Sequence, residues 1–163
     1  MTSTTHHTTE AEHTRELGSE LGRQLRAGDV VVLTGEVGAG KTTFTQGLAS
    51  GLGVRGPITS PTFVLARKHP SLIGGPELVH VDAYRIDGTL DLEDLDLDAD
   101  LDAAVVVVEW GRGLADELSP ERVEVLLRRP VGDAEGDERE IVIDFVGHEW
   151  AQRVGDSSPS TDA

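Results

Sequence analysis

A glycine-rich stretch of the chain has the residue types and the spacing of a loop that binds phosphate. Residues 35–42 read Gly-Glu-Val-Gly-Ala-Gly-Lys-Thr, which fits the P-loop pattern G-x-x-x-x-G-K-[ST]. Glycines allow the backbone to curl around a phosphate with its N–H groups pointing inward. The lysine brings positive charge to the β- and γ-phosphates, and the threonine hydroxyl after it suits Mg²⁺. The stretch predicts a nucleoside triphosphate site with contacts from Gly38, Ala39, Gly40, Lys41, Thr42 and Thr43.

Two acidic residues stand at the ends of predicted strands, where such a site would need them. Asp82 ends the predicted strand Leu78-Val79-His80-Val81-Asp82, and Glu109 follows the valine run 105–108. Strands in P-loop folds present functional groups at their carboxyl ends, and a P-loop requires an acidic partner near its metal. Glu109 is the stronger metal candidate because its strand is the more apolar, and Asp82 would then orient the attacking water or act as a base. Either acid could instead be a strand-end cap or a surface carboxylate.

The elements that would position these groups follow one another along a single α/β domain. Apolar residues four apart predict helices over residues 10–26 and 41–52. Apolar runs predict strands over 30–34, 62–68, 78–82, 103–108, 122–129 and 140–146, with the second and third forming one hairpin and the last two another. The polar residues 1–9 and 148–163 are expected to be disordered tails, which leaves 10–147 as the P-loop domain.

Composition narrows the class of protein further. Fourteen basic and 30 acidic residues give a net charge of −16, which opposes direct binding of nucleic acid. There is no cysteine, so disulfides and cysteine metal sites are excluded. The sequence has no apolar run of about 18 residues and no secretory signal at its start, so we expect a cytoplasmic protein without a membrane span. GTP is disfavoured because the Asn-Lys-x-Asp stretch typical of GTPases is absent.

Four blocks of sequence occur together in a recognisable order and spacing. They are Gly-Glu-Val-Gly-Ala-Gly-Lys-Thr-Thr-Phe at 35–44, Thr-Ser-Pro-Thr-Phe at 59–63, His-Val-Asp-Ala-Tyr-Arg at 80–85 and Val-Glu-Trp-Gly at 108–111. With these blocks the chain resembles the bacterial TsaE (YjeE) ATPases over about residues 10–146. One departure is Gly111-Arg112-Gly113, where many relatives carry another acidic residue.

The resemblance implies a fold, an activity and a set of partners. The fold would be a small α/β P-loop domain with a mixed parallel and antiparallel sheet flanked by helices. The activity would be Mg²⁺-dependent ATP hydrolysis that supports threonylcarbamoyladenosine formation in tRNAs reading codons that begin with adenine. TsaB-like and TsaD-like proteins would be its partners, with TsaD performing the transfer and the tRNA held by the complex.

The resemblance also implies roles for individual residues. Lys41 and Asp82 would be catalytic, Thr42 and Glu109 would hold Mg²⁺, and Thr14 would lie near the adenine. Residues 59–63 would form a switch-like loop. Two other functions stay open on the residues alone: a small-molecule or nucleoside kinase, which would need an arginine-rich lid and an acceptor pocket, and a module that senses ATP without hydrolysing it.

Overall fold

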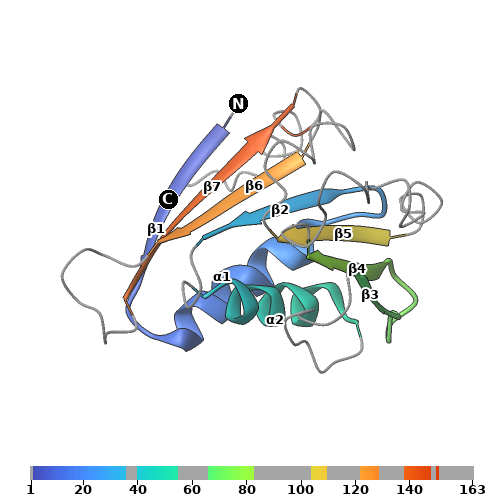
Figure 1. The fold of residues 1–163 in the computed structure, drawn as a ribbon. Coiled ribbons are helices and arrows are strands. Elements are labelled where there is room, and N and C mark those ends of the chain that lie inside the picture. The colour runs from blue at the N-terminus through green and yellow to red at the C-terminus, as the bar shows by residue number, and fades with distance from the viewer. Residues whose placement is uncertain are drawn as a thin grey trace, which may run out of the picture.

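Seven strands and two helices make up a computed structural model that describes residues 2–35, 40–54, 66–82, 104–109, 122–128, 138–147 and 150 (Figure 1). The strands form one sheet in the order β1-β7-β6-β2-β5-β4-β3. Their bounds are β1 Thr2–Thr8, β2 Val30–Thr34, β3 Ala66–His69, β4 Glu77–Asp82, β5 Ala104–Glu109, β6 Arg122–Arg128 and β7 Arg139–Val146. The helices are α1 Ala11–Gln24 and α2 Lys41–Leu52.

The centre of the sheet is parallel and its margins are antiparallel. Strands β6, β2, β5 and β4 run in the same direction, whereas β7 and β1 on one side and β3 on the other run against their neighbours. Strands buried on both faces read as continuous apolar runs. All six residues of β5 are buried, as are the first four of β2. The valine runs of the sequence therefore become the middle of the sheet.

Both helices lie on the same side of the sheet and pack closely against each other (Figure 1). Glycines at the contact permit this approach. A Cβ at Gly47 of α2 would lie 1.9 Å from the backbone oxygen of Arg15, and one at Gly18 of α1 would lie 2.2 Å from that of Phe44. Real Cβ atoms do not approach other atoms so closely, so larger residues here would push the helices apart.

Most of the predicted elements are confirmed. Both helices, the two hairpins β3–β4 and β6–β7 and the doubly buried strand β5 occur where the sequence predicted them, within a few residues at the ends. The α/β fold with a mixed sheet is confirmed as well. The switch-like loop expected at residues 59–63 lies outside the described residues. Within the part of the chain that the structure describes, no helix is long and apolar enough to cross a membrane.

The prediction of a disordered N-terminal tail over residues 1–9 is wrong for residues 2–8. They form β1, which pairs antiparallel with β7 from Thr2 opposite Phe145 to Thr8 opposite Arg139. The segment lacks the apolar residues that the prediction required, but an edge strand is held by backbone hydrogen bonds. Threonine, which recurs along this strand, is β-branched and suits an extended chain.

The predicted C-terminal tail over 148–163 is wrong at one described position. Trp150 is 3% exposed, and its ring centre lies 5.3 Å from that of Phe145 on β7. A tilted pair of aromatic rings at this separation is favourable beyond the area it buries. Trp150 is therefore part of the core formed by the sheet and the two helices.

Candidate nucleotide-binding site

The connection between β2 and α2 carries the P-loop sequence. Gly35 follows β2 directly, and Gly40 precedes Lys41, the first residue of α2. Gly40 has φ 102° and ψ 14°, a left-handed conformation that favours glycine. No side chain caps this helix start among the described residues, so its first-turn N–H groups and the positive end of the helix dipole suit an anion. Gly38 and Ala39 lie outside the described residues.

Lys41 lies directly after this loop, at the first position of α2. Its side chain is buried at 7% exposure, and its Nζ donates a hydrogen bond of 2.6 Å to the carbonyl oxygen of Gly35. The bond joins the two ends of the loop. An ammonium removed from water is costly unless oxygen acceptors or negative charge surround it. The arrangement therefore favours a phosphate as a neighbour of Lys41.

Asp82 and Glu109 meet at the same edge of the sheet as this loop. Because β2, β5 and β4 are parallel neighbours, their carboxyl ends coincide, and the register sets Glu109 opposite both Leu33 and Asp82. Glu109 is 4% exposed. Only the backbone of Asp82 is described. Thr42 and Thr43 lie half-buried in the first turn of α2. The structure thus brings the end of β4 with Asp82, the end of β5 with Glu109 and the start of α2 with Thr42 to one edge of the sheet.

Glu109 is engaged by a histidine to which the sequence interpretation gave no role. The Nε2 atom of His80 lies 2.7 Å from Oε2 of Glu109, and the two side chains are 0% and 5% exposed. His80 comes two residues before Asp82 in β4. This spacing was a usable signal, because a polar residue two positions before a predicted functional acid faces the same side of the sheet.

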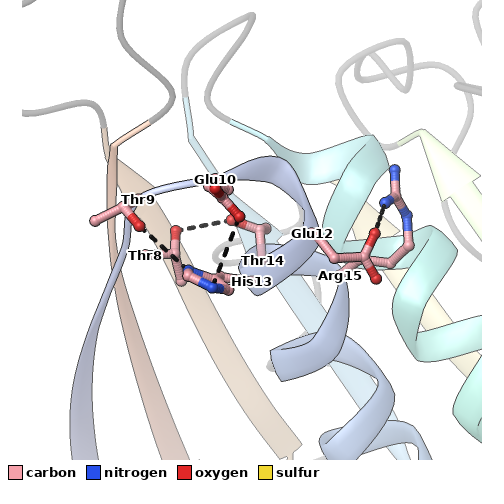
Figure 2. A network of polar contacts seen from close by, with 7 residues as sticks. All are labelled: Thr8, Thr9, Glu10, Glu12, His13, Thr14 and Arg15. Carbon is pink, nitrogen blue, oxygen red and sulfur yellow. Dashed lines mark hydrogen bonds and ion pairs between the residues drawn. The ribbon is translucent and has the colours of Figure 1, made fainter.

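Thr14 approaches the loop from α1. It is 2% exposed, and its Oγ1 lies 2.8 Å from Oγ1 of Thr8 at the end of β1 (Figure 2). A Cβ built at Gly40 would lie 3.8 Å from Cγ2 of Thr14, 3.6 Å from Cδ2 of Leu127 and 3.8 Å from Nε of Arg139. Thr14, a predicted nucleotide contact, therefore borders the end of the P-loop, as do two residues that the sequence interpretation did not select.

A short polar network holds the start of α1 against β1. Figure 2 shows the Thr8–Thr14 contact beside a second one, in which Oγ1 of Thr9 lies 3.2 Å from Nδ1 of His13. Oε2 of Glu10 lies 3.8 Å from Nε2 of the same histidine. Of these contacts, the buried one between Thr8 and Thr14 joins the first turn of α1 to the end of β1, whereas the two contacts of His13 are exposed.

Comparisons with known proteins agree with the resemblance. A family model described as threonylcarbamoyl adenosine biosynthesis protein TsaE matches residues 8–141. The chain is 57% identical over 138 residues to the tRNA threonylcarbamoyladenosine biosynthesis protein TsaE of Streptomyces coelicolor, covering 84% of this chain and 93% of that protein. It is 37% identical over 144 residues to the protein of the same name from Bacillus subtilis, covering 88% and 86%.

A solved structure agrees with the fold as well. The crystal structure of Bacillus subtilis YdiB superposes with a TM-score of 0.74 at 29% sequence identity, covering 95% of this chain and 93% of that one. The family match takes in β2, α2, β4 and β5, the elements whose ends meet at the P-loop edge. The chain therefore belongs to the TsaE family of threonylcarbamoyl adenosine biosynthesis proteins.

Proposed function

We propose that this protein is a Mg²⁺-dependent ATPase that supports threonylcarbamoyladenosine formation in tRNA, acting in the cytoplasm with TsaB-like and TsaD-like proteins. The pathway follows from membership of the TsaE family. One observation carries the biochemical part of the proposal: Lys41, at the start of α2, and Glu109, at the end of β5, belong to elements that meet at the same edge of the sheet. A phosphate-binding cation and an acid for its metal are the two parts that P-loop chemistry requires.

The residues at this edge fit a magnesium nucleotide. Mg²⁺ is usually held by one or two carboxylates together with substrate phosphates and water, not by a complete protein cage. Within the described ranges, no group of three or more histidine, aspartate or glutamate side chains could hold a metal. The buried Glu109 would supply one such carboxylate. Glu109 and the hydroxyl of Thr42 would hold the ion, which when bound neutralises charge on the phosphates.

The remaining predicted residues have distinct roles in the proposal. Lys41 binds the β- and γ-phosphates with its ammonium, and the first turn of α2 adds its N–H groups. Asp82 is the register neighbour of Glu109 on an adjacent strand, so its backbone lies about 5 Å away, which suits an acid that orients the attacking water. Thr14 borders Gly40 on the α1 side, which supports a contact with the nucleoside.

Partners are expected to complete the reaction. The net charge of −16 opposes an independent tRNA site, so in this proposal the tRNA is held by the TsaD-like partner. Phosphoryl-transfer enzymes of this class often depend on a partner for water positioning or for an arginine that stabilises the transition state. Hydrolysis by the isolated chain is therefore expected to be slow.

The first experiment measures ATP hydrolysis by the purified protein alone and with the TsaB-like and TsaD-like proteins of the same organism. We expect the partners to raise the release of inorganic phosphate, and we expect Asp82→Ala or Glu109→Ala to remove that rise. No effect of the partners on turnover or on nucleotide affinity would overturn the proposal. Transfer of the phosphate to a small acceptor would indicate a kinase instead.

A further inference from the structure

The contact between His80 and Glu109 has no role in the function proposed above. It joins two polar side chains that are nearly excluded from water, on neighbouring strands whose sequence positions are 29 residues apart. His80 is opposite Val107 in the register, so its side chain reaches one step along β5 toward the end of the strand. The contact therefore points toward the edge of the sheet where the P-loop lies.

The geometry of this pair suits donation from the imidazole to the carboxylate. With its hydrogen on Nε2, His80 donates to Oε2 of Glu109, because carboxylate oxygens are acceptors. The other ring nitrogen, Nδ1, has no hydrogen-bond partner among the described residues. A nitrogen that bears no hydrogen is the form that suits this position, since a buried N–H without an acceptor is costly.

We propose that His80 is a positioning residue that sets the orientation of the Glu109 carboxylate for Mg²⁺. This inference rests on the proposed function, in which Glu109 is a metal ligand. By holding Oε2, the imidazole leaves Oε1 as the oxygen available to a metal and restricts rotation of the carboxylate. Carboxylates that bind metals are commonly oriented by such hydrogen bonds, and loss of the partner typically weakens metal affinity about 10- to 100-fold.

Core stability alone does not explain the pair. On the same face, β4 and β5 place Leu78, Val105 and Val107 in the apolar core beneath the helices. Replacing a buried polar pair by apolar residues of similar volume is often neutral or stabilising, because the polar groups lose hydration. β4 instead places the histidine two residues before Asp82, so one strand supplies both the positioning group and the proposed catalytic acid.

The test compares the Mg²⁺ dependence of nucleotide binding in matched variants. His80→Leu removes the donor with little change in volume, and His80→Gln retains an N–H donor. We expect His80→Leu to raise the Mg²⁺ concentration for half-maximal binding of a fluorescent ATP analogue about 10- to 100-fold. Binding measured in a metal chelator should not change, and His80→Gln should restore most of the loss. An unchanged Mg²⁺ requirement in His80→Leu would overturn the inference, as would equal losses in both variants.

Two further variants separate the possible causes. His69→Leu removes another buried strand histidine, 6% exposed and paired with Leu78 toward the other end of β4, and should leave the Mg²⁺ requirement unchanged. Glu109→Gln tests the metal ligand itself. If Glu109→Gln has no effect, the proposed metal site fails; if it raises the Mg²⁺ requirement and His80→Leu does not, only the role of His80 fails.

A measurement on the unmodified protein keeps the inference testable if His80→Leu does not fold. Nitrogen-15 spectra of the metal-free chain report which imidazole nitrogen carries the hydrogen, and the His80 signal is assigned by its absence in His80→Gln. We expect hydrogen on Nε2, in slow exchange with water. Hydrogen on Nδ1 alone would overturn the inference, because Nε2 could then not donate to the carboxylate.

Discussion

At the scale of single residues, the site depends on polar side chains that are buried before any ligand arrives. Lys41 is 7% exposed and donates to Gly35, while Glu109 is 4% exposed and lies within hydrogen-bond distance of His80. Each internal contact offsets part of the cost of removing a charged group from water. Such contacts hold the two groups in place, so little ordering of their side chains remains when a nucleotide binds.

Replacing Lys41 by alanine tests the phosphate contact. A charge-assisted hydrogen bond contributes about 1.5–3 kcal/mol, so we expect Lys41→Ala to weaken ATP binding about 10- to 100-fold. Isothermal titration calorimetry measures the affinity, and Lys68→Ala, at an exposed lysine on β3, is the matched control for loss of one positive charge. Equal affinities in Lys41→Ala and the unmodified protein would contradict the site assignment.

The buried hydroxyl pair Thr8–Thr14 gives a second prediction at this scale. Thr14→Val keeps the side-chain shape but leaves the hydroxyl of Thr8, which is 6% exposed, without this partner. We expect a loss of about 1–3 kcal/mol in the free energy of unfolding, measured in urea. The double variant Thr8→Val, Thr14→Val should lose less than the sum of the single variants, because both hydroxyls are then absent. Strict additivity would show that the two side chains do not interact.

At the scale of elements, the contact between α1 and α2 positions α2, the helix that follows the P-loop. Gly18 on α1 and Gly47 on α2 have no Cβ, so the backbone of the other helix can lie where a Cβ would otherwise be. This contact holds α1, and with it Thr14, beside the start of α2. A small-residue contact between helices thus connects the β1 end of the domain to the P-loop.

Gly47→Ala tests that contact. The new Cβ would meet backbone atoms of Arg15, which cannot rotate away, so the helices must separate. Overpacking of this kind costs about 1–3 kcal/mol, against about 1 kcal/mol gained from helix propensity, and we expect net destabilisation in urea unfolding. Gly75→Ala, where the nearest atoms lie at 3.8 and 3.9 Å, is the matched control and should have little effect. Equal stability of the two variants would argue against a tight helix contact.

At the scale of the whole molecule, four parallel strands form the centre of the sheet, and antiparallel strands extend it on both sides. Parallel pairing brings the carboxyl ends of β2, β4 and β5 together, and this is what assembles the site. β1 covers the edge of β7 and ends at Thr8, beside Thr14. The N-terminal segment therefore protects the sheet edge and also supports one side of the site.

Net charge gives a prediction for the whole molecule. With 30 acidic and 14 basic residues, we expect the isolated protein to bind tRNA more weakly than about 10⁻⁴ M at physiological salt. Filter binding over a range of salt concentrations measures this, and the TsaB-like and TsaD-like proteins with the same tRNA provide the positive control. Salt-sensitive binding by the chain alone in the micromolar range would show that it has its own tRNA site.

The sequence by itself determined the features that depend on neighbouring residues. The P-loop pattern, the helices over 10–26 and 41–52 and the valine strand were all readable, because each depends on spacings of a few residues. The prediction that Glu109 and Asp82 end strands at one edge also held, since parallel strands that follow the P-loop share that edge.

Only the tertiary structure decided which distant residues touch. The pairing of His80 with Glu109 and the approach of Thr14 to Gly40 both depend on strand order, register and helix packing. The addition of the polar segment 2–8 as β1 depends on a free edge of β7, which no pattern within the segment encodes. These contacts join segments far apart in the chain, and their free energy arises only when the sheet has formed.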